Sequence, residues 1–509
     1  MGRHKANECG RHFKQQKAIL MKQHPILIGK QGRNYLNFEG SEHAALYART
    51  GTGKTSSVVI PNCFSWRGSL VVLDVKGEAF RATAGYRSRV LGQDVFLFDP
   101  AAENERTHRW NPLAPVQRTS LDRFDQISRQ AFMLFPEVTT GSGGNAEAFW
   151  TPSARGAFTA VATLLAETPG RQFSMAEVLR CFARGDSQDM LASLIQQRRG
   201  SGTPGYSQIA IDGISDYATG SSDQVGGIRK MASTRLQSWF NPRIAAATAA
   251  SDFDLRQFRR RPMTIYITVQ PGNIPRMRPL LALFFDALVN LNTDATPEED
   301  PTIQHQGLII LDEFARLGRM ESLAEAAQYV RGYGMRLLYV IQNKAQLRAK
   351  YGADSAEDIF DNTGAEIVFG ANDLKLTKEL SDRMGDQTIN VTTKNRPRFM
   401  AWLNPSKQSE AEHPHRRPLM LAQEVARMDP CEQIVLRGGM LPLKTQRACW
   451  YNDPNFTSLV RPVPLIPTLD VTVALDDGST TLRVGMNPPL PAITAATVKP
   501  ELVEAADAE

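Results

Sequence analysis

The sequence predicts an α/β fold, in which a mainly parallel central sheet is combined with an inserted all-α domain. Short apolar runs alternate with stretches of helical periodicity over residues 25–115 and again over 256–455. Such runs are typical of parallel strands covered by helices on both faces. Residues 116–255, which lie between the two regions, have mostly helical periodicity. The expected strands span residues 43–47, 69–73, 94–98, 263–269, 307–311, 336–341 and 365–369.

Length and composition indicate a globular protein of about two or three domains. Of the 509 residues, 42% are hydrophobic and 22% are charged, which is ordinary for a soluble chain. We predict a basic N-terminal arm (1–24), a sheet domain built from 25–115 and 256–455, the all-α insert (116–255) and a flexible, Pro-rich and acidic C-terminal tail (456–509).

The positive charge of the chain is concentrated near its N-terminus. Residues 1–34 hold eight Lys or Arg and one Glu, a net charge of +7, whereas the whole chain carries +6. An arm this basic favours contact with nucleic acid or an anionic membrane surface, although a solvated tail has the same composition. We find no signal peptide and no run of about 18–20 apolar residues, so we expect no membrane-spanning helix.

The five cysteines are scattered along the chain, and none of them has metal-ligand spacing relative to another. This pattern predicts a reducing compartment, without a structural disulfide or a zinc site.

Residues 48–55, with the sequence ARTGTGKT, fit the phosphate-binding loop of P-loop proteins, except that Ala48 replaces the usual first glycine. Glycines in this loop let backbone N–H groups approach phosphate oxygens. Lys54 would place a positive charge on the β- and γ-phosphates, and Thr55 would offer its hydroxyl to Mg²⁺. The alternative is a Gly-rich turn with a surface lysine. The candidate residues for binding ATP are Gly51, Thr52, Gly53, Lys54 and Thr55.

A second motif lies more than 250 positions further on, where the apolar run 308–311 ends in Asp312 and Glu313. A buried parallel strand presents both carboxylates at its carboxyl end, where α/β folds bind ligands. Asp312 would hold Mg²⁺ through water, and Glu313 would deprotonate the attacking water. A solvent-exposed strand end is the alternative. With the phosphate loop, this pair predicts a RecA-like P-loop NTPase that hydrolyses ATP with Mg²⁺.

The residues after the acid pair supply two further candidates. Gln342 ends the strand expected at 336–341, where a polar residue in RecA-like motors senses the γ-phosphate. Arg331 precedes that strand and is a candidate arginine finger for a neighbouring subunit, with Arg336 as its rival. A surface arginine is the alternative for Arg331. We therefore expect Lys54 and the acid pair to lie within roughly 15 Å of each other on one sheet.

The chain resembles the coupling proteins of type IV secretion systems, of the TraG/VirD type. The resemblance runs from about residue 40 to 450 and includes the pattern DxKGE followed by NPL, which separates this family from other RecA-like motors. The stretches that carry it are ARTGTGKT (48–55), VVLDVKGE (71–78), WNPL (110–113), FWTPSAR (149–155), LIILDEFARLG (308–318), the segment 331–342 and ELSDRMGDQT (379–388).

This resemblance implies a homo-hexameric motor ATPase that links a DNA–protein complex, the relaxosome with its relaxase, to a type IV secretion channel. It implies sequence-independent DNA binding, and a location in the bacterial cytoplasm at the cytoplasmic face of the inner membrane. It also implies that Gln342 is the sensor and Arg331 the arginine finger. Most relatives carry N-terminal transmembrane helices. Their absence here leaves open a soluble branch, a truncated chain, peripheral membrane contact through the basic arm, or a separate membrane-anchor protein.

Two other functions remain open from the sequence. One is a coupling ATPase that recruits protein effectors without DNA. The other is a non-enzymatic scaffold that nucleotide stabilises.

Overall fold

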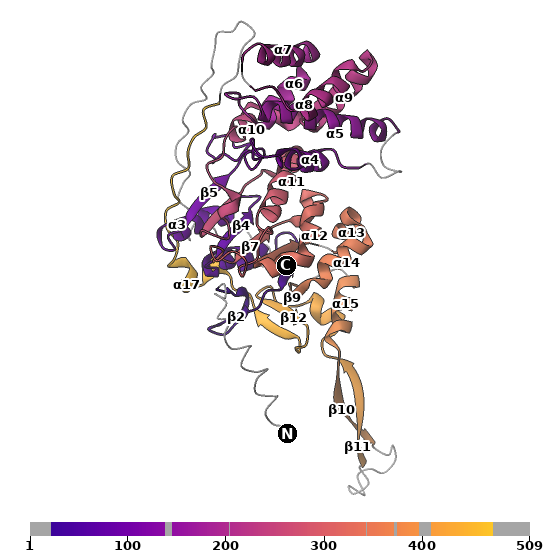
Figure 1. Cartoon of the computed structure of the whole chain (residues 1–509). Helices are drawn as coiled ribbons and strands as arrows, with labels where there is room; N and C mark the ends of the chain where they lie inside the picture. The colour runs from indigo at the N-terminus through magenta and orange to yellow at the C-terminus, as the bar shows by residue number, and fades with distance from the viewer. Residues whose placement is uncertain are drawn as a thin grey trace, which may run out of the picture.

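The structure is a computed structural model that describes residues 22–137, 145–202, 204–342, 344–370, 374–395 and 409–471 (Figure 1). Its largest element is a sheet of 11 strands in the order β2-β1-β13-β12-β9-β3-β8-β7-β4-β6-β5.

Seven neighbouring strands of this sheet, from β9 to β5 in spatial order, are all parallel. Most of their side chains are buried, which explains why most of these strands read as apolar runs, although β5 and β9 are partly exposed. The expected parallel α/β fold is therefore confirmed, with strand ends shifted by at most two residues. These strands are β3 (His43–Tyr47), β4 (Ser69–Leu73), β5 (Asp94–Phe98), β6 (Met263–Ile267), β7 (Gly307–Leu311), β8 (Met335–Ile341) and β9 (Thr363–Val368).

Four antiparallel strands extend the sheet beyond β9, and we did not predict them. They are β1 (Ile26–Gln31), β2 (Asn34–Phe38), β12 (Glu432–Arg437) and β13 (Leu443–Gln446). A separate pair, β10 (Asp386–Asn395) and β11 (Ser409–Pro418), projects from the body as a hairpin (Figure 1). Strand β2 is half-exposed, β10 and β11 are polar, and β13 has only four residues, so these sequences lack long apolar runs. Strands β1 and β12 do contain apolar runs of three residues, Ile26–Ile28 and Ile434–Leu436, which we did not interpret as strands.

The two faces of the sheet are covered by two separate hydrophobic cores. Alternate side chains of β4 divide between them, because Leu70 and Val72 face one core and Val71 and Leu73 the other. Helices α2 (Ile60–Ser65) and α3 (Glu78–Arg89) cover the first face. The second face is covered by α11 (Ile274–Asn290), α12 (Glu321–Tyr329), α13 (Lys344–Tyr351), α14 (Ala353–Asp361), α15 (Leu374–Met384) and α16 (Ala422–Ala426).

Between β5 and β6 the described residues form helices and no strand, and most of these helices gather at one end of the molecule (Figure 1). The insertion boundaries at 116 and 255 stay a prediction. The helices are α4 (Arg123–Leu134), α5 (Asn145–Ala166), α6 (Met175–Ala183), α7 (Ser187–Arg199), α8 (Gln208–Thr219), α9 (Ser222–Arg235) and α10 (Pro242–Ala247).

The WNPL stretch joins the sheet to these helices. Trp110 is buried, with its ring 5.0 Å from that of Phe284 on α11 and 6.2 Å from that of Phe98 on β5. Its backbone N–H donates to Ala247 O at 2.9 Å, and the Asn111 side chain donates to Phe173 O at 2.7 Å. Apart from any chemistry, this motif therefore fixes how the helices attach to the strands.

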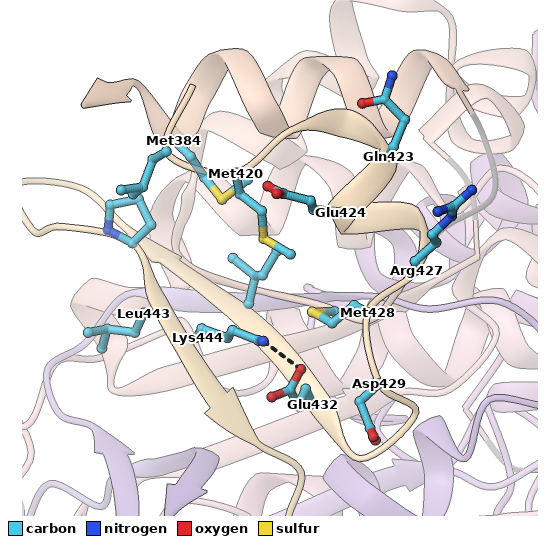
Figure 2. A pocket seen from close by; sticks show the side chains of 13 residues that line it. Met384, Met420, Gln423, Glu424, Arg427, Met428, Asp429, Glu432, Leu443 and Lys444 are labelled. Carbon is cyan, nitrogen blue, oxygen red and sulfur yellow. Dashed lines mark ion pairs between the residues drawn. The ribbon is translucent and has the colours of Figure 1, made fainter. Parts of the chain in front are cut away.

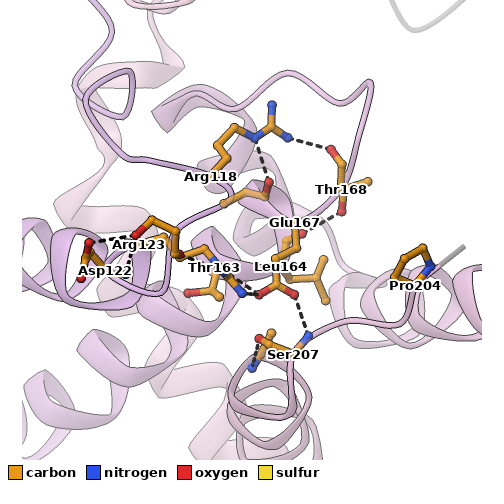
Figure 3. A network of polar contacts seen from close by, with 12 residues as sticks. Arg118, Asp122, Arg123, Thr163, Leu164, Glu167, Thr168, Pro204 and Ser207 are labelled. Atoms are coloured by element: carbon orange, nitrogen blue, oxygen red, sulfur yellow. Dashed lines mark hydrogen bonds and ion pairs between the residues drawn. The ribbon is translucent and has the colours of Figure 1, made fainter.

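A polar network fixes the helices to one another (Figure 3). The carboxylate of Glu167, just after α5, accepts from Arg123 Nε of α4 at 3.0 Å and from the Ser207 backbone N–H before α8 at 2.7 Å. Burial raises the pKa of Glu167, but the bonds from Ser207 and Arg123 outweigh it and hold that pKa below its usual value. Arg118 caps the end of α5 by donating to Ala166 O at 2.8 Å.

The start of the predicted flexible tail is packed on the body. Val460, Val463 and Ile466 lie against the core that contains α2 and α3, and Leu469 N–H donates to Glu105 O at 2.8 Å. A Cβ on Gly85 of α3 would lie 2.2 Å from Arg461 O, so only glycine allows this approach. Residues 456–471 therefore pack on the folded body, the boundary of the flexible tail stays a prediction, and 472–509 lie outside the described residues. Within the described ranges, no helix is long and apolar enough to cross a membrane.

Candidate nucleotide site

The phosphate loop leaves the sheet at the carboxyl end of β3, which lies between β8 and β9. Gly51 and Gly53 have φ values of 81° and 76°, in the left-handed region that favours glycine. The chain then enters a helical turn, Thr55–Val59, that continues into α2, and Ser57 N–H donates to Gly53 O at 2.9 Å. This geometry is that of a loop whose N–H groups can surround an anion at a helix start.

The two motifs meet at this edge of the sheet. Thr55 Oγ1 donates to Asp312 Oδ2 at 2.7 Å, although 257 positions separate the residues. Lys54 Nζ lies 3.3 Å from Glu313 Oε1 and 3.8 Å from Asp312 Oδ1. The expected convergence on one sheet is therefore observed, whereas the chemical roles of these residues stay predictions.

Strand β7 delivers the acid pair into a buried position. Burial raises the pKa of Asp312, while Lys54 and the Thr55 hydroxyl lower it. Asp312 Oδ1 has no hydrogen-bond donor among the described residues. A buried carboxylate oxygen without a donor, next to a hydroxyl, suits a hard cation such as Mg²⁺, which prefers oxygen ligands. Glu313 has a φ of 60°, in the left-handed region. Residues other than glycine rarely adopt this backbone conformation, and those that do cluster at functional sites.

Gln342 connects the acid pair to the phosphate loop. Its Nε2 donates to Glu313 Oε1 at 3.3 Å, and its Oε1 accepts from Thr50 Oγ1 at 2.9 Å. Arg316, which we did not predict, has its Nε 2.6 Å from Glu313 Oε2. A change at either motif can therefore reach the other through Gln342.

The two candidate arginines have different surroundings. Arg336 is fully buried and donates to the carbonyls of His24, Phe38 and Glu42, so it is not available to a second subunit. Arg331 is exposed in the short helical segment before β8. That segment is at the opposite end of β8 from Gln342, which places Arg331 away from the nucleotide site of its own chain.

Two residues near the phosphate loop, Asp74 and Arg447, were not among the candidates predicted from the sequence. Asp74, at the carboxyl end of β4, accepts from Phe80 N–H at 2.8 Å. Burial raises its pKa to about 7; the N–H groups of Phe80 and Ala79 oppose this shift, and the charge of Asp312 adds to it. Arg447 donates to Thr52 O at 2.8 Å across 395 positions, and no local sequence signal indicates that contact.

The basic run 256–261 is not a free cationic patch. Arg256, Arg260 and Arg261 form ion pairs with Asp254, Asp300 and Asp94, at 3.0, 2.7 and 2.9 Å. Arg259 is buried and donates to Asn292 O at 2.7 Å. The arginines of this run are therefore engaged in contacts that stabilise the turn before β6.

The phosphate loop on β3, the acid pair on β7 and the glutamine on the intervening β8 define a RecA-like P-loop nucleotide-binding protein. The chain matches the family "Type IV secretory system Conjugative DNA transfer" over residues 6–468, so it belongs to that family.

Curated relatives are similar to the chain over most of its length. The chain is 29% identical to Protein VirD4 of Agrobacterium fabrum, over 82% of this chain and 60% of that protein. It is 26% identical to Conjugal transfer protein TraG of Escherichia coli, over 83% of this chain and 69% of TraG. The chain thus spans less than two thirds of the length of VirD4.

The conjugative coupling protein TrwB has the same fold. Its unbound form superposes with a TM-score of 0.57 at 18% identity, covering 84% of this chain and 88% of TrwB. Its complex with ADP and Mg²⁺ gives a TM-score of 0.57 at 17% identity, covering 84% and 95%.

Proposed function

We propose that this protein is a Mg²⁺-dependent ATPase that couples a DNA–protein substrate to a type IV secretion channel during conjugative transfer. The observation that carries the proposal is the meeting of Lys54 and Thr55 with Asp312 and Glu313 at one edge of one sheet. Family membership, and the names of the relatives TraG and TrwB, support the role in conjugation.

In this proposal the side chains divide the chemistry among them. Lys54 and the loop N–H groups of residues 51–55 bind the triphosphate, and Thr55 and Asp312 hold the metal. Bound Mg²⁺ would neutralise charge that develops on the transferred phosphoryl group. Glu313 accepts the proton of the attacking water, and Gln342 orients that water and transmits the state of the site to the phosphate loop.

We further propose that the subunits form a homo-hexamer in which Arg331 serves the nucleotide of the neighbouring subunit. Its exposure, and its distance along β8 from its own site, favour action between subunits. Mixing R331A protein with K54A protein tests this, because a mixed assembly contains interfaces with an intact loop on one side and an intact arginine on the other. Restored ATPase activity in the mixture is expected, and no gain over the separate variants would contradict the proposal.

The DNA role is tested by ATPase assays with single-stranded and double-stranded DNA at low and high salt. We expect stimulation that does not depend on sequence and decreases as salt rises, because contacts to the phosphate backbone release counterions. Turnover without DNA binding or stimulation at low salt would instead favour a motor for protein effectors. An assembly that binds ATP but never turns it over would favour a scaffold.

We also propose that the protein works at the cytoplasmic face of the bacterial inner membrane, through its basic arm or a separate membrane-anchor protein. The net charge of +7 over residues 1–34 supports contact with anionic lipid. Sedimentation with vesicles of anionic and of neutral phospholipid, with and without the neighbouring gene products, distinguishes the two routes. Binding to neither vesicle under any condition would contradict a membrane location.

A further inference from the structure

The antiparallel strands that extend the sheet also reach the phosphate loop. Just after β13, the guanidinium of Arg447 donates through Nη1 to Thr52 O at 2.8 Å and through Nε to Glu432 O at 3.0 Å. The same group lies 3.7 Å from the centre of the Phe369 ring. Arg447 is 9% exposed, so these contacts are shielded from water. Its guanidinium is thus held in one orientation on the outer side of the loop.

A second contact from the same segment lies two residues further on. Cys449 Sγ is 3.1 Å from Ser57 Oγ, in the first helical turn after the phosphate loop. We call residues 447–449 the clamp segment. It contacts Thr52 before Lys54 and Ser57 after Thr55, so it touches the chain on both sides of these two residues in the sequence.

The clamp segment is supported by neighbouring strands of the sheet. Phe369 follows β9, and its N–H donates to Tyr47 O at 3.0 Å, so the aromatic platform is fixed to the strand that carries the loop. Strands β12 and β13 are cross-linked by the ion pair between Lys444 Nζ and Glu432 Oε2 at 2.7 Å. Figure 2 shows this pair on the two strands, beside a groove bounded by Met420 and Met428.

The bond to Thr52 O acts on the amide that follows. Thr52 C=O and Gly53 N–H belong to one planar trans peptide, so they point in opposite directions. Because Arg447 holds the carbonyl outward, the Gly53 N–H is turned the other way, toward the hollow of the loop. Successive N–H groups turned into one hollow form an anion-binding nest.

We propose that Arg447 is a positioning residue that preorganises the phosphate loop for the triphosphate of ATP. It does not touch the nucleotide itself and acts through the Thr52–Gly53 peptide. This inference rests on the proposed ATPase function, because it assumes that the loop binds a triphosphate. Since the loop binds the phosphates in the ground state and the transition state alike, losing Arg447 should raise KM and leave kcat nearly unchanged.

The test is a titration of full-length protein with a fluorescent ATP analogue and Mg²⁺, together with steady-state ATPase kinetics. For R447M we expect Kd and KM to rise about tenfold, the size of one charge-assisted hydrogen bond, with kcat within about twofold of wild type. R447K should be intermediate, because lysine keeps the charge without the planar fork. The matched control is R437M, since Arg437 lies at the other end of β12, with its guanidinium 5.0 Å from the Phe38 ring.

The outcomes distinguish failure of the proposed ATPase function from failure of the role of Arg447. If wild-type protein fails to bind the analogue, the proposed function fails. If wild type binds and K54A does not, but R447M and R447K bind as wild type does, only the role of Arg447 is rejected. Equal weakening in R437M, or a loss confined to kcat, would also reject it. Should R447M not fold by circular dichroism, R447K provides the comparison, and wild-type affinity in R447K would overturn the inference.

Discussion

Replacing Glu313 with glutamine removes the proposed base with the smallest change in shape. Glu313 Oε1 lies 3.3 Å from both Lys54 Nζ and Gln342 Nε2, and Oε2 lies 2.6 Å from Arg316 Nε. A glutamine can keep an acceptor oxygen in this position but cannot take up the proton of the attacking water. We therefore expect E313Q to retain the site and lose the chemical step.

The size of the loss follows from the single role assigned to this carboxylate. Removing a positioned general base lowers turnover by about 10²–10⁴-fold. That range corresponds to about 3–5 kcal/mol of transition-state stabilisation. Binding should change little, because Lys54 keeps its contact with Asp312 at 3.8 Å and Thr55 keeps its bond to Asp312 at 2.7 Å.

Phosphate release and the affinity for an ATP analogue are to be measured on the same preparations. The matched control is E321Q, since Glu321 is an exposed carboxylate on α12 whose ion pair with Arg319, at 2.9 Å, lies outside the site. The control should turn over like wild type. If E313Q keeps turnover within about tenfold of wild type, Glu313 is not the base and the reasoning is wrong.

Two further predictions concern stability. His43 accepts from Leu337 N–H through Nδ1 and donates through Nε2 to Ala327 O, and burial lowers its pKa to about 4 from the usual 6.5. As the pH falls, His43 is protonated in the unfolded chain before it is protonated in the folded protein. Its contribution to the free energy of unfolding is therefore fully present above pH 6.5, and about 3 kcal/mol of it is lost as the pH decreases to 4. Urea denaturation at pH 7 and pH 4 measures how much stability each protein loses on acidification. We expect this loss to be smaller in H43Q than in wild type by about 3 kcal/mol, and an equal loss in both proteins would contradict the role of His43. W110A should lower the free energy of unfolding, measured by the same urea denaturation, by about 3–5 kcal/mol, because a large ring is removed from between the sheet and the helices. A loss below about 1 kcal/mol would show that Trp110 does not stabilise the contact between the sheet and the helices.

The parts of the fold that the sequence predicted are those in which local pattern and burial agree. Most of the seven central strands are apolar runs, because both faces of a parallel strand are covered. The antiparallel strands escaped prediction since β2 is half-exposed and β13 has only four residues, so neither produces a long apolar run. The packing of residues 456–471 depends on the distant Gly85, and a Pro-rich composition does not reveal such a contact.

The same distinction holds for the candidate site. Lys54, Thr55, Asp312 and Glu313 lie in motifs whose spacing reflects the chemistry of a triphosphate, and Gln342 could be found because it ends the strand after the acid pair. Arg447 is fixed only by sheet topology, since β12 and β13 must first pair beyond β9 before it reaches Thr52.

A double-mutant cycle on Mg²⁺-dependent ATP binding, with T55A, D312N and the double variant, tests whether the two motifs form one nucleotide site. In the proposed site both side chains hold one metal, with Thr55 Oγ1 and Asp312 Oδ2 2.7 Å apart. We therefore expect that the double variant loses clearly less affinity than the sum of the single losses, with a coupling of about 1 kcal/mol or more. Strictly additive losses, or Mg²⁺-dependent binding that neither substitution affects, would mean that the two motifs do not share one nucleotide site.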